Sequence, residues 1–170
     1  MVRNAAACTA LAISLAACMP SGGVETRSGE LDDLRHFVSV GPELNPCTVE
    51  NTSAKLGVTF ERVEERQFFD TYVAVGTGAI ASYQLRAAKA AAKSGHLLIA
   101  ELKANAVRVD QVTAMIGRGE DPALLVESPG LYGGRQPYGS LSYDQGRNDV
   151  AIVYALAGRQ MVESVSVNCR

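Results

Sequence analysis

The sequence predicts an α+β fold, in which a mainly antiparallel sheet carries one or two helices on one face and is closed by a single disulfide. Apolar and polar residues alternate near the carboxyl end, as they do in half-buried strands. An alanine-rich segment near the middle has helical spacing, and two cysteines lie in the chain after residue 30. The chain has 170 residues, 47% of them hydrophobic, which suits one packed domain and excludes a mainly disordered chain.

The charge balance and the missing motifs narrow the functional classes. The sequence has 16 basic and 18 acidic side chains, a formal net charge of −2, which argues against a nucleic-acid partner. It has 2 histidines, and the motifs HExxH, GxSxG and SxxK do not occur in it. We therefore predict no catalytic residue, no metal site and no cofactor, and we interpret His36 and His96 as structural or surface residues.

The first residues are typical of a targeting leader. Arg3 supplies a positive charge, and residues 5–17 are apolar apart from Thr9 and Ser14. This run is shorter than the roughly 20 residues that a membrane-spanning helix needs. A charged start, a short apolar run and small residues before a cleavage site indicate a secretory signal peptide. We assign residues 1–17 to this signal peptide and leave them out of the predicted fold.

Leu15-Ala16-Ala17-Cys18 stands at the cleavage site. This segment resembles the lipobox of bacterial lipoprotein precursors, in which a branched apolar residue and two small residues precede a cysteine. The resemblance implies that Cys18 receives a diacylglyceryl group on its sulfur, that the leader is cut before it, and that the new amino terminus is acylated, for example with palmitate. Several acyl chains hold a protein to a membrane more firmly than one. The alternative is ordinary cleavage after Ala17, with Cys18 unmodified.

The residues after Cys18 indicate where the domain is held. Met19, rather than an aspartate, follows the cysteine, and the resemblance then implies sorting to the outer membrane, with the domain facing the periplasm. Residues 18–30 are rich in Gly and Ser and predict a flexible tether, which would reach about 20 Å. Residues 31–170 are predicted to form a single globular domain.

Two cysteines remain in the predicted domain. Cys8 lies in the leader and Cys18 would carry the lipid, so Cys47 and Cys169 are left to form one disulfide in an oxidising compartment. The alternative is a redox or nucleophilic cysteine. No CxxC motif occurs in the sequence, and Cys169 is the penultimate residue, so we favour the disulfide.

The first part of the domain predicts short strands separated by turns. Residues 34–40 are predicted to form a strand that ends at a Gly-Pro pair, and a turn follows at residues 45–47. Alternating apolar residues predict a strand over 56–61, and residues 64–67 predict a polar link. A further strand is predicted over 68–75.

The alanine-rich segment predicts a helix over residues 78–94. Thr77 would cap its start and Gly95 would follow its end. Arg86 and Lys89 would lie together on its solvated side. Residues 97–116 remain open: they fit one helix, or two strands over 96–102 and 106–112, and we favour a strand directly after Gly95.

The last part of the chain carries the clearest strand pattern. A polar connector is predicted over 117–122 and a short strand over 123–127. Residues 140–143 and 150–156 are predicted to form a hairpin, and residues 161–169 alternate as a third strand. The predicted result is an antiparallel meander that the disulfide closes.

One segment matches a dinucleotide-binding pattern. Gly76-Thr77-Gly78 and Ala81 fit G-x-G-x-x-A after a predicted strand and before a predicted helix, and Glu101 could hold a ribose hydroxyl. The predicted export and the lack of repeating strand–helix units oppose that function. We favour a structural turn at this place.

The glycine-rich loop over residues 128–139 is the candidate ligand or partner loop. It carries Tyr132, Arg135 and Tyr138, and exposed tyrosines among glycines suit contact with a peptide or a glycan.

These features predict a membrane-anchored envelope lipoprotein that acts as a binding, structural or accessory component in assembly. Its expected partners are the membrane, through the lipid anchor, and another envelope protein. Two alternatives remain: an envelope enzyme whose active site no motif reveals, and a nucleotide-binding domain that uses Gly76-Thr77-Gly78.

Overall fold

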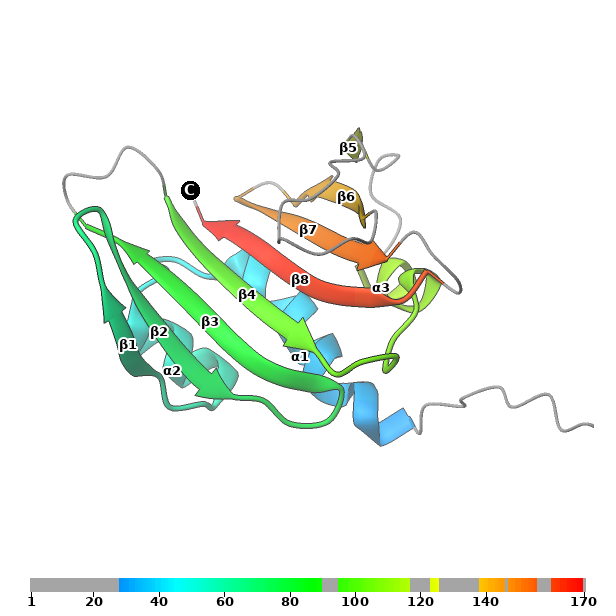
Figure 1. Ribbon diagram of the computed structural model, residues 1–170, viewed down its shortest axis with the longest axis horizontal. Helices are drawn as coiled ribbons and strands as arrows, with labels where there is room; N and C mark the ends of the chain where they lie inside the picture. Colours follow the sequence, from blue (N-terminus) through cyan, green and yellow to red (C-terminus); the bar gives the residue numbers. More distant parts are fainter. Residues whose placement is uncertain are drawn as a thin grey trace, which may run out of the picture.

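The computed structural model describes residues 28–89, 95–116, 123–125, 138–145, 147–155 and 160–169. Within these ranges an eight-stranded antiparallel sheet carries three α-helices, all on one face (Figure 1). The predicted fold class, α+β with a mainly antiparallel sheet and one disulfide, is confirmed.

The helical elements lie in two places along the chain. The first group precedes the sheet: η1 (Ser28–Leu31), α1 (Asp32–Val40), η2 (Gly41–Glu43) and α2 (Val49–Leu56). The helix α3 (Val109–Ile116) lies between the two halves of the sheet. In the part of the chain that the structure describes, no helix is both long and apolar enough to cross a membrane.

The sheet consists of two four-stranded meanders that meet edge to edge. The first contains β1 (Glu61–Glu65), β2 (Phe69–Val75), β3 (Ile80–Ala88) and β4 (His96–Leu102). The second contains β5 (Ala123–Leu125), β6 (Tyr138–Asp144), β7 (Asn148–Ala155) and β8 (Val162–Cys169). The order across the sheet is β1-β2-β3-β4-β8-β7-β6-β5, so the last strands of both meanders pair at its middle. In both halves of the chain helical structure comes first and a four-stranded meander follows: α1 and α2 precede the first meander, and α3 precedes the second.

Several predicted strands are confirmed. Strands β2 and β5 occupy most of the ranges predicted for them, and β4 follows Gly95 as expected. The predicted hairpin is the β6–β7 pair, and β8 continues the meander as the pattern indicated. The alternation is visible in β7, where a buried residue follows each partly buried one along the whole strand.

The strand predicted over 34–40 is wrong, because these residues form most of α1. Their buried side chains, Leu34, Phe37 and Val38, are three and four positions apart and so lie on one side of a helix. Asp32 and Asp33 lie in the first turn, where negative charge favours a helix. The apolar residues at the end of this segment, over 37–40, also suit a strand, which is why the helical spacing was not recognised in the sequence.

The strand over 56–61 and the polar link over 64–67 are also corrected. Leu56 is the last residue of α2, whose first turn is capped by Thr48: its Oγ1 accepts a hydrogen bond from the Asn51 amide at 3.3 Å. Gly57 ends the helix with a left-handed φ of +68°. Residues 64 and 65 belong to β1, an exposed edge strand, whereas residues 66 and 67 lie in the link between β1 and β2 as predicted.

The helix predicted over 78–94 is wrong for the residues that the structure describes. Residues 80–88 form β3, which pairs with β2 on one side and β4 on the other. Thr77 does not cap a helix, since its hydroxyl donates to Asp33 Oδ2 at 2.7 Å. The polar residues Ser82, Gln84 and Arg86 alternate with buried residues, which is strand spacing. Residues 90–94 lie outside the described ranges.

The second strand considered for 97–116, over 106–112, is wrong because α3 begins at Val109. The Arg108 amide donates to Gln111 Oε1 at 2.9 Å at the start of this helix. Asp110 lies in its first turn, and Val112 is fully buried. Helical spacing therefore prevails over the strand preference of the valines.

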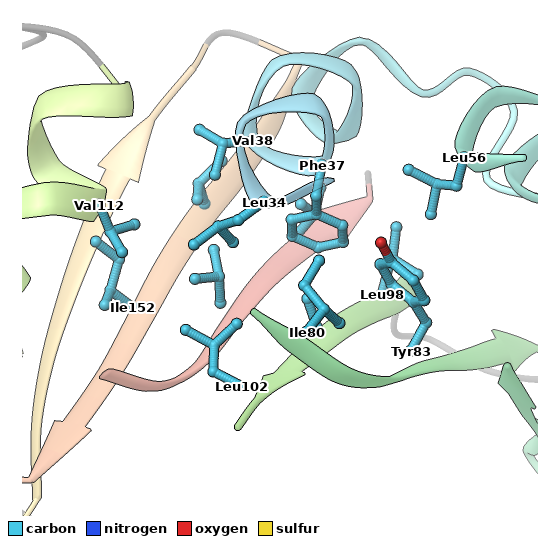
Figure 2. Packing of buried hydrophobic residues seen from close by; sticks show 14 of the residues in the cluster. Leu34, Phe37, Val38, Leu56, Ile80, Tyr83, Leu98, Leu102, Val112 and Ile152 are labelled. Atoms are coloured by element: carbon cyan, nitrogen blue, oxygen red, sulfur yellow. The ribbon is translucent and has the colours of Figure 1, made fainter. Parts of the chain in front are cut away.

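The core lies between the helices and one face of the sheet. Figure 2 shows Phe37 of α1 beside Ile80 and Tyr83 of β3, and Val112 of α3 against Ile152 of β7, with Leu34 of α1 between these two groups. The Phe37 and Tyr83 rings are 5.9 Å apart between centroids. Burial, together with a smaller contribution from the charge of Asp33, raises the pKa of Tyr83 to about 12.

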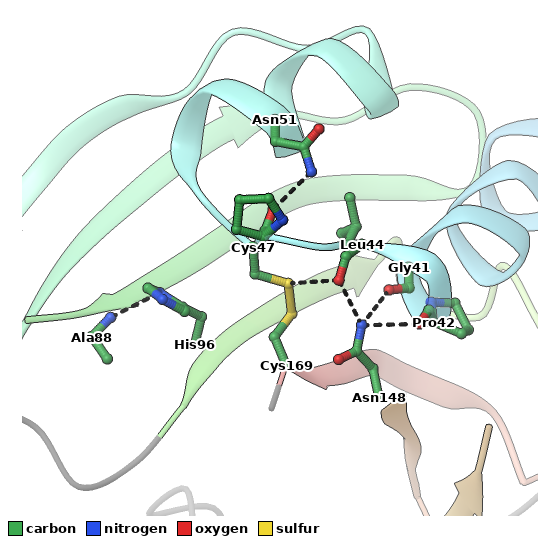
Figure 3. Close-up of a disulfide and its surroundings, with 10 residues drawn as sticks. Gly41, Pro42, Leu44, Cys47, Asn51, Ala88, His96, Asn148 and Cys169 are labelled. Atoms are coloured by element: carbon green, nitrogen blue, oxygen red, sulfur yellow. Dashed lines mark hydrogen bonds between the residues drawn. A yellow bond between two sulfur atoms is a disulfide. The ribbon is translucent and has the colours of Figure 1, made fainter. Parts of the chain in front are cut away.

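A disulfide joins the helix layer to the sheet. Cys47, between η2 and α2, is bonded to Cys169 at the end of β8, as predicted (Figure 3). Beside this bond, Asn148 Nδ2 lies 3.0 to 3.2 Å from the carbonyl oxygens of Gly41, Pro42 and Leu44. The turn predicted at 45–47 is confirmed and contains a cis bond between Asn45 and Pro46.

Loss of the disulfide should destabilise the domain. It closes a loop with a sequence separation of 122, so the chain-entropy model gives at most about 4–5 kcal/mol for its contribution. We expect the Cys47→Ser/Cys169→Ser variant to unfold at a lower urea concentration than the oxidised wild type. Equal unfolding midpoints would mean that the Asn148 hydrogen bonds suffice to hold this corner.

Alkaline pH should destabilise the domain through Tyr83. An unfolded tyrosine has a pKa of about 10, below the folded value of about 12. The stabilisation is therefore fully present below about pH 10 and is lost as the pH rises toward 12. We expect the Tyr83→Phe variant to lose less unfolding free energy than the wild type over this interval, by about 2 kcal/mol. Parallel pH profiles of the two proteins would contradict this assignment.

Candidate functional site

The two faces of the sheet differ because side chains alternate along each strand. One face is buried under the helices, and in the described part of the chain no helix lies on the other, which we call the open face (Figure 1). The register places the following residues in its central part: Ser82, Gln84 and Arg86 of β3; Leu97, Ile99 and Glu101 of β4; Ser164, Ser166 and Asn168 of β8; and Asp149, Ala151 and Val153 of β7.

Small side chains in the middle of the open face leave shallow depressions in its surface. Serines and alanines from β3, β6, β7 and β8 lie beside the half-buried Leu97, Ile99 and Val153. Two hollows result. Among the residues lining the first hollow, of about 660 Å³, are Glu101, Lys103, Met161 and Glu163. Among those lining the second hollow, of about 500 Å³, are Gly95, Asp149, Ser166 and Asn168.

Arg86 is the residue that the two hollows share among the described residues that line them. Its Nε donates to Gln84 Oε1 at 3.1 Å, two positions away on the same face of β3. No carboxylate of the described ranges lies within 4.0 Å of its guanidinium. The nearby Glu64 has a lowered pKa, mainly through its hydrogen bond with Arg66, and the charge of Arg86 makes a smaller contribution.

The acidic and basic groups of the first hollow are partly engaged by neighbours. Glu101 Oε2 accepts a hydrogen bond from the Ser82 hydroxyl at 3.0 Å. The Lys103 ammonium donates to the Gly78 carbonyl at 2.6 Å. Arg86 is therefore the cation of the hollows whose terminal nitrogens bond to no side chain or backbone group among the described residues, which makes it the best candidate to contact a ligand.

The glycine motif does not form a dinucleotide site. Gly76-Thr77-Gly78 joins the antiparallel strands β2 and β3, so the segment after it is a strand and not the helix that such a site requires. The turn and the residue after it are instead hydrogen-bonded to η1 and α1, at the start of the described chain. The Ala79 amide donates to the Glu30 carbonyl at 2.7 Å, next to the bond between Thr77 and Asp33. The structural turn favoured from the sequence is present, but it connects two strands.

The other predicted site residues divide into three groups. Cys47 and Cys169 form the disulfide as predicted. Cys18, Tyr132 and Arg135 lie outside the described residues. Tyr138 begins β6, where its backbone is paired with Ala155 beside the first hollow.

The ring of each histidine is hydrogen-bonded to a backbone group. His36 Nε2 lies 2.8 Å from the Lys55 carbonyl, and His96 Nδ1 accepts a hydrogen bond from the Ala88 amide at 3.1 Å. Across the described ranges, no three His, Cys, Asp or Glu side chains are grouped so that they could hold a metal ion.

The sequence did not lead us to predict that Arg86 lies on the open face of a sheet. Arg86 was expected on a helix beside Lys89, but Lys89 forms ion pairs with Glu65 and Asp70 at the edge of the sheet. The usable signal was the alternation Ser82, Gln84, Arg86, which has a period of two. The alanines that follow favour a helix and concealed it.

No known family model, curated protein or solved structure matches this chain.

The turn at Gly78 should tolerate substitution less well than another glycine with the same backbone requirement. Gly78 and Gly57 have φ values of +56° and +68°. A Cβ at Gly78 would lie 2.6 Å from the Glu30 carbonyl oxygen, whereas nothing lies within 4 Å of one at Gly57. We expect Gly57→Ala to cost about 1 kcal/mol of unfolding free energy, and Gly78→Ala to cost about 1–3 kcal/mol more.

Urea unfolding of the two variants measures this difference. Equal losses would show that only the left-handed backbone matters and that the contact with Glu30 contributes nothing.

Proposed function

We propose that this chain is a lipid-anchored envelope protein, held at the outer membrane and facing the periplasm, that binds a partner protein through the open face. The likeness of Leu15-Ala16-Ala17-Cys18 to a lipobox supports the anchor. The disulfide agrees with export, because such bonds persist in oxidising compartments.

The observation that carries the binding role is the contrast between the two faces. The helices pack on one face, whereas Leu97, Ile99 and Val153 lie half-buried in the middle of the other. The small side chains around them allow another chain to approach the strands closely. An apolar centre with a polar surround, over which no helix of the described residues lies, is the pattern of an interaction surface.

The anchor would place one end of this surface near the membrane. Lys103, which lines the first hollow, donates to Gly78, and the adjoining Ala79 is bonded to Glu30 of η1. The first hollow therefore lies at the end of the sheet where the tether would join the domain. Anchoring confines a binding domain to the membrane surface, where it meets other envelope proteins at high effective concentration.

Two measurements on living cells test this proposal. We expect the wild type to incorporate a labelled fatty acid and to sediment with membranes, and the Cys18→Ala variant to lose both properties. A photoactivatable residue in place of Ser166, at the centre of the open face, should form a crosslink to one envelope protein that mass spectrometry identifies.

The matched control carries the photoactivatable residue in place of Lys55, an exposed side chain of α2 on the helical side. It should not give the same product. Fatty-acid labelling that survives Cys18→Ala would refute the anchor, and equal crosslinking from both positions, or none from Ser166, would refute binding through the open face.

A further inference from the structure

Arg86 combines three properties that point to a ligand with a negative group. Its side chain is exposed on the open face, it lines both hollows, and the Gln84 amide oxygen holds its Nε. The contact with Gln84 restricts the orientation of the guanidinium. Its two terminal nitrogens can then present the parallel pair of donors that matches a carboxylate.

The other charges of the hollows limit how much negative charge a ligand can bring. Glu101 and Glu163 line the first hollow with Lys103, and Asp149 lines the second. Each hollow is therefore close to neutral when Arg86 is counted. A polyanion such as nucleic acid or a phosphate-rich glycolipid would be repelled by these carboxylates, whereas one carboxylate can pair with Arg86 without bringing further negative charge.

The floor of the open face favours a peptide over a sugar. Leu97 is the cross-strand neighbour of Arg86, and Ile99 is the neighbour of Gln84, so aliphatic surface adjoins the guanidinium. Ser166 and Asn168 continue the same rows on β8 and offer hydroxyl and amide groups. Among the described residues that line the two hollows, Phe69 in the second is the one aromatic residue, and a sugar would find no ring to stack on in the first.

We propose that the open face binds an extended acidic peptide segment of the partner protein, with one carboxylate on Arg86 and an aliphatic side chain on Leu97 or Ile99. This inference rests on the proposed function. Both hollows lie along β4, whose 7 residues span about 23 Å. A segment of about seven extended residues fits this length.

The test uses a displayed library of random linear decapeptides and the purified full chain. Selected peptides should share an acidic residue beside an aliphatic one. Their affinity should fall about 10- to 100-fold in Arg86→Gln, which removes one charged hydrogen-bonding group. It should fall further in Arg86→Glu, and Arg86→Lys should restore part of it, because a lysine keeps the charge without the paired donors.

Lys55→Glu is the matched control, since it makes the same change of charge on the helical side. The affinity of this variant for the selected peptides should stay within twofold of the wild type. Thermal melts should show that all variants fold. Selected peptides without an acidic residue, an Arg86→Gln affinity within twofold of the wild type, or displacement of the peptide by millimolar inorganic phosphate would each overturn the acidic-peptide proposal.

The crosslinking experiment separates this failure from failure of the proposed function. If the library yields no binder while the photoactivatable residue at position 166 still captures one identified protein, the open face binds a partner and the acidic-peptide inference is wrong. If neither experiment gives a product, both proposals are wrong.

Discussion

The bond between Cys47 and Cys169 is the constraint on which the layered arrangement depends. It ties the chain between η2 and α2 to β8, the strand that joins the two meanders. Asn148 strengthens the same corner by bonding three backbone carbonyls of the helix layer. At Gly41, a Cβ would lie 2.6 Å from Val167 Cγ2, so the backbone can reach the sheet this closely only without a side chain. The helices are therefore held against one face, and no helix of the described residues covers the other face.

A second connection fixes the opposite end of the helix layer. After the turn between β2 and β3, the Ala79 amide donates a hydrogen bond to the Glu30 carbonyl. Within the turn, the Thr77 hydroxyl donates one to the Asp33 carboxylate. The sequence of this turn resembles a phosphate-binding loop, but its backbone amide is already used inside the domain. The same glycines that would let a cofactor approach here let the start of α1 approach. A short glycine pattern therefore has different roles according to the element that follows it.

The open face follows from the period of two in β3, β4, β7 and β8. Shifting β3 or β4 by one residue would bury Arg86 or Glu101 and expose Leu85 or Ala100, which are fully buried. The core thus sets the register, and the register in turn places the polar residues together. Arg86, Ile99 and Ser166 come from distant parts of the sequence, and only the pairing of β4 with β3 and β8 makes them neighbours.

The sequence by itself determined the disulfide, the strands of the second meander and β2, because alternation and cysteine number are local signals with few alternatives. It did not determine α1, α2 or β3: the apolar run after Asp33 and the alanines after Arg86 have local preferences that the opposite assignment also satisfies. The pairing of β3 between two strands, and the burial of α1 on that sheet, decided these elements. The open face was therefore visible only in the tertiary structure, since it requires strands far apart in the chain to lie side by side.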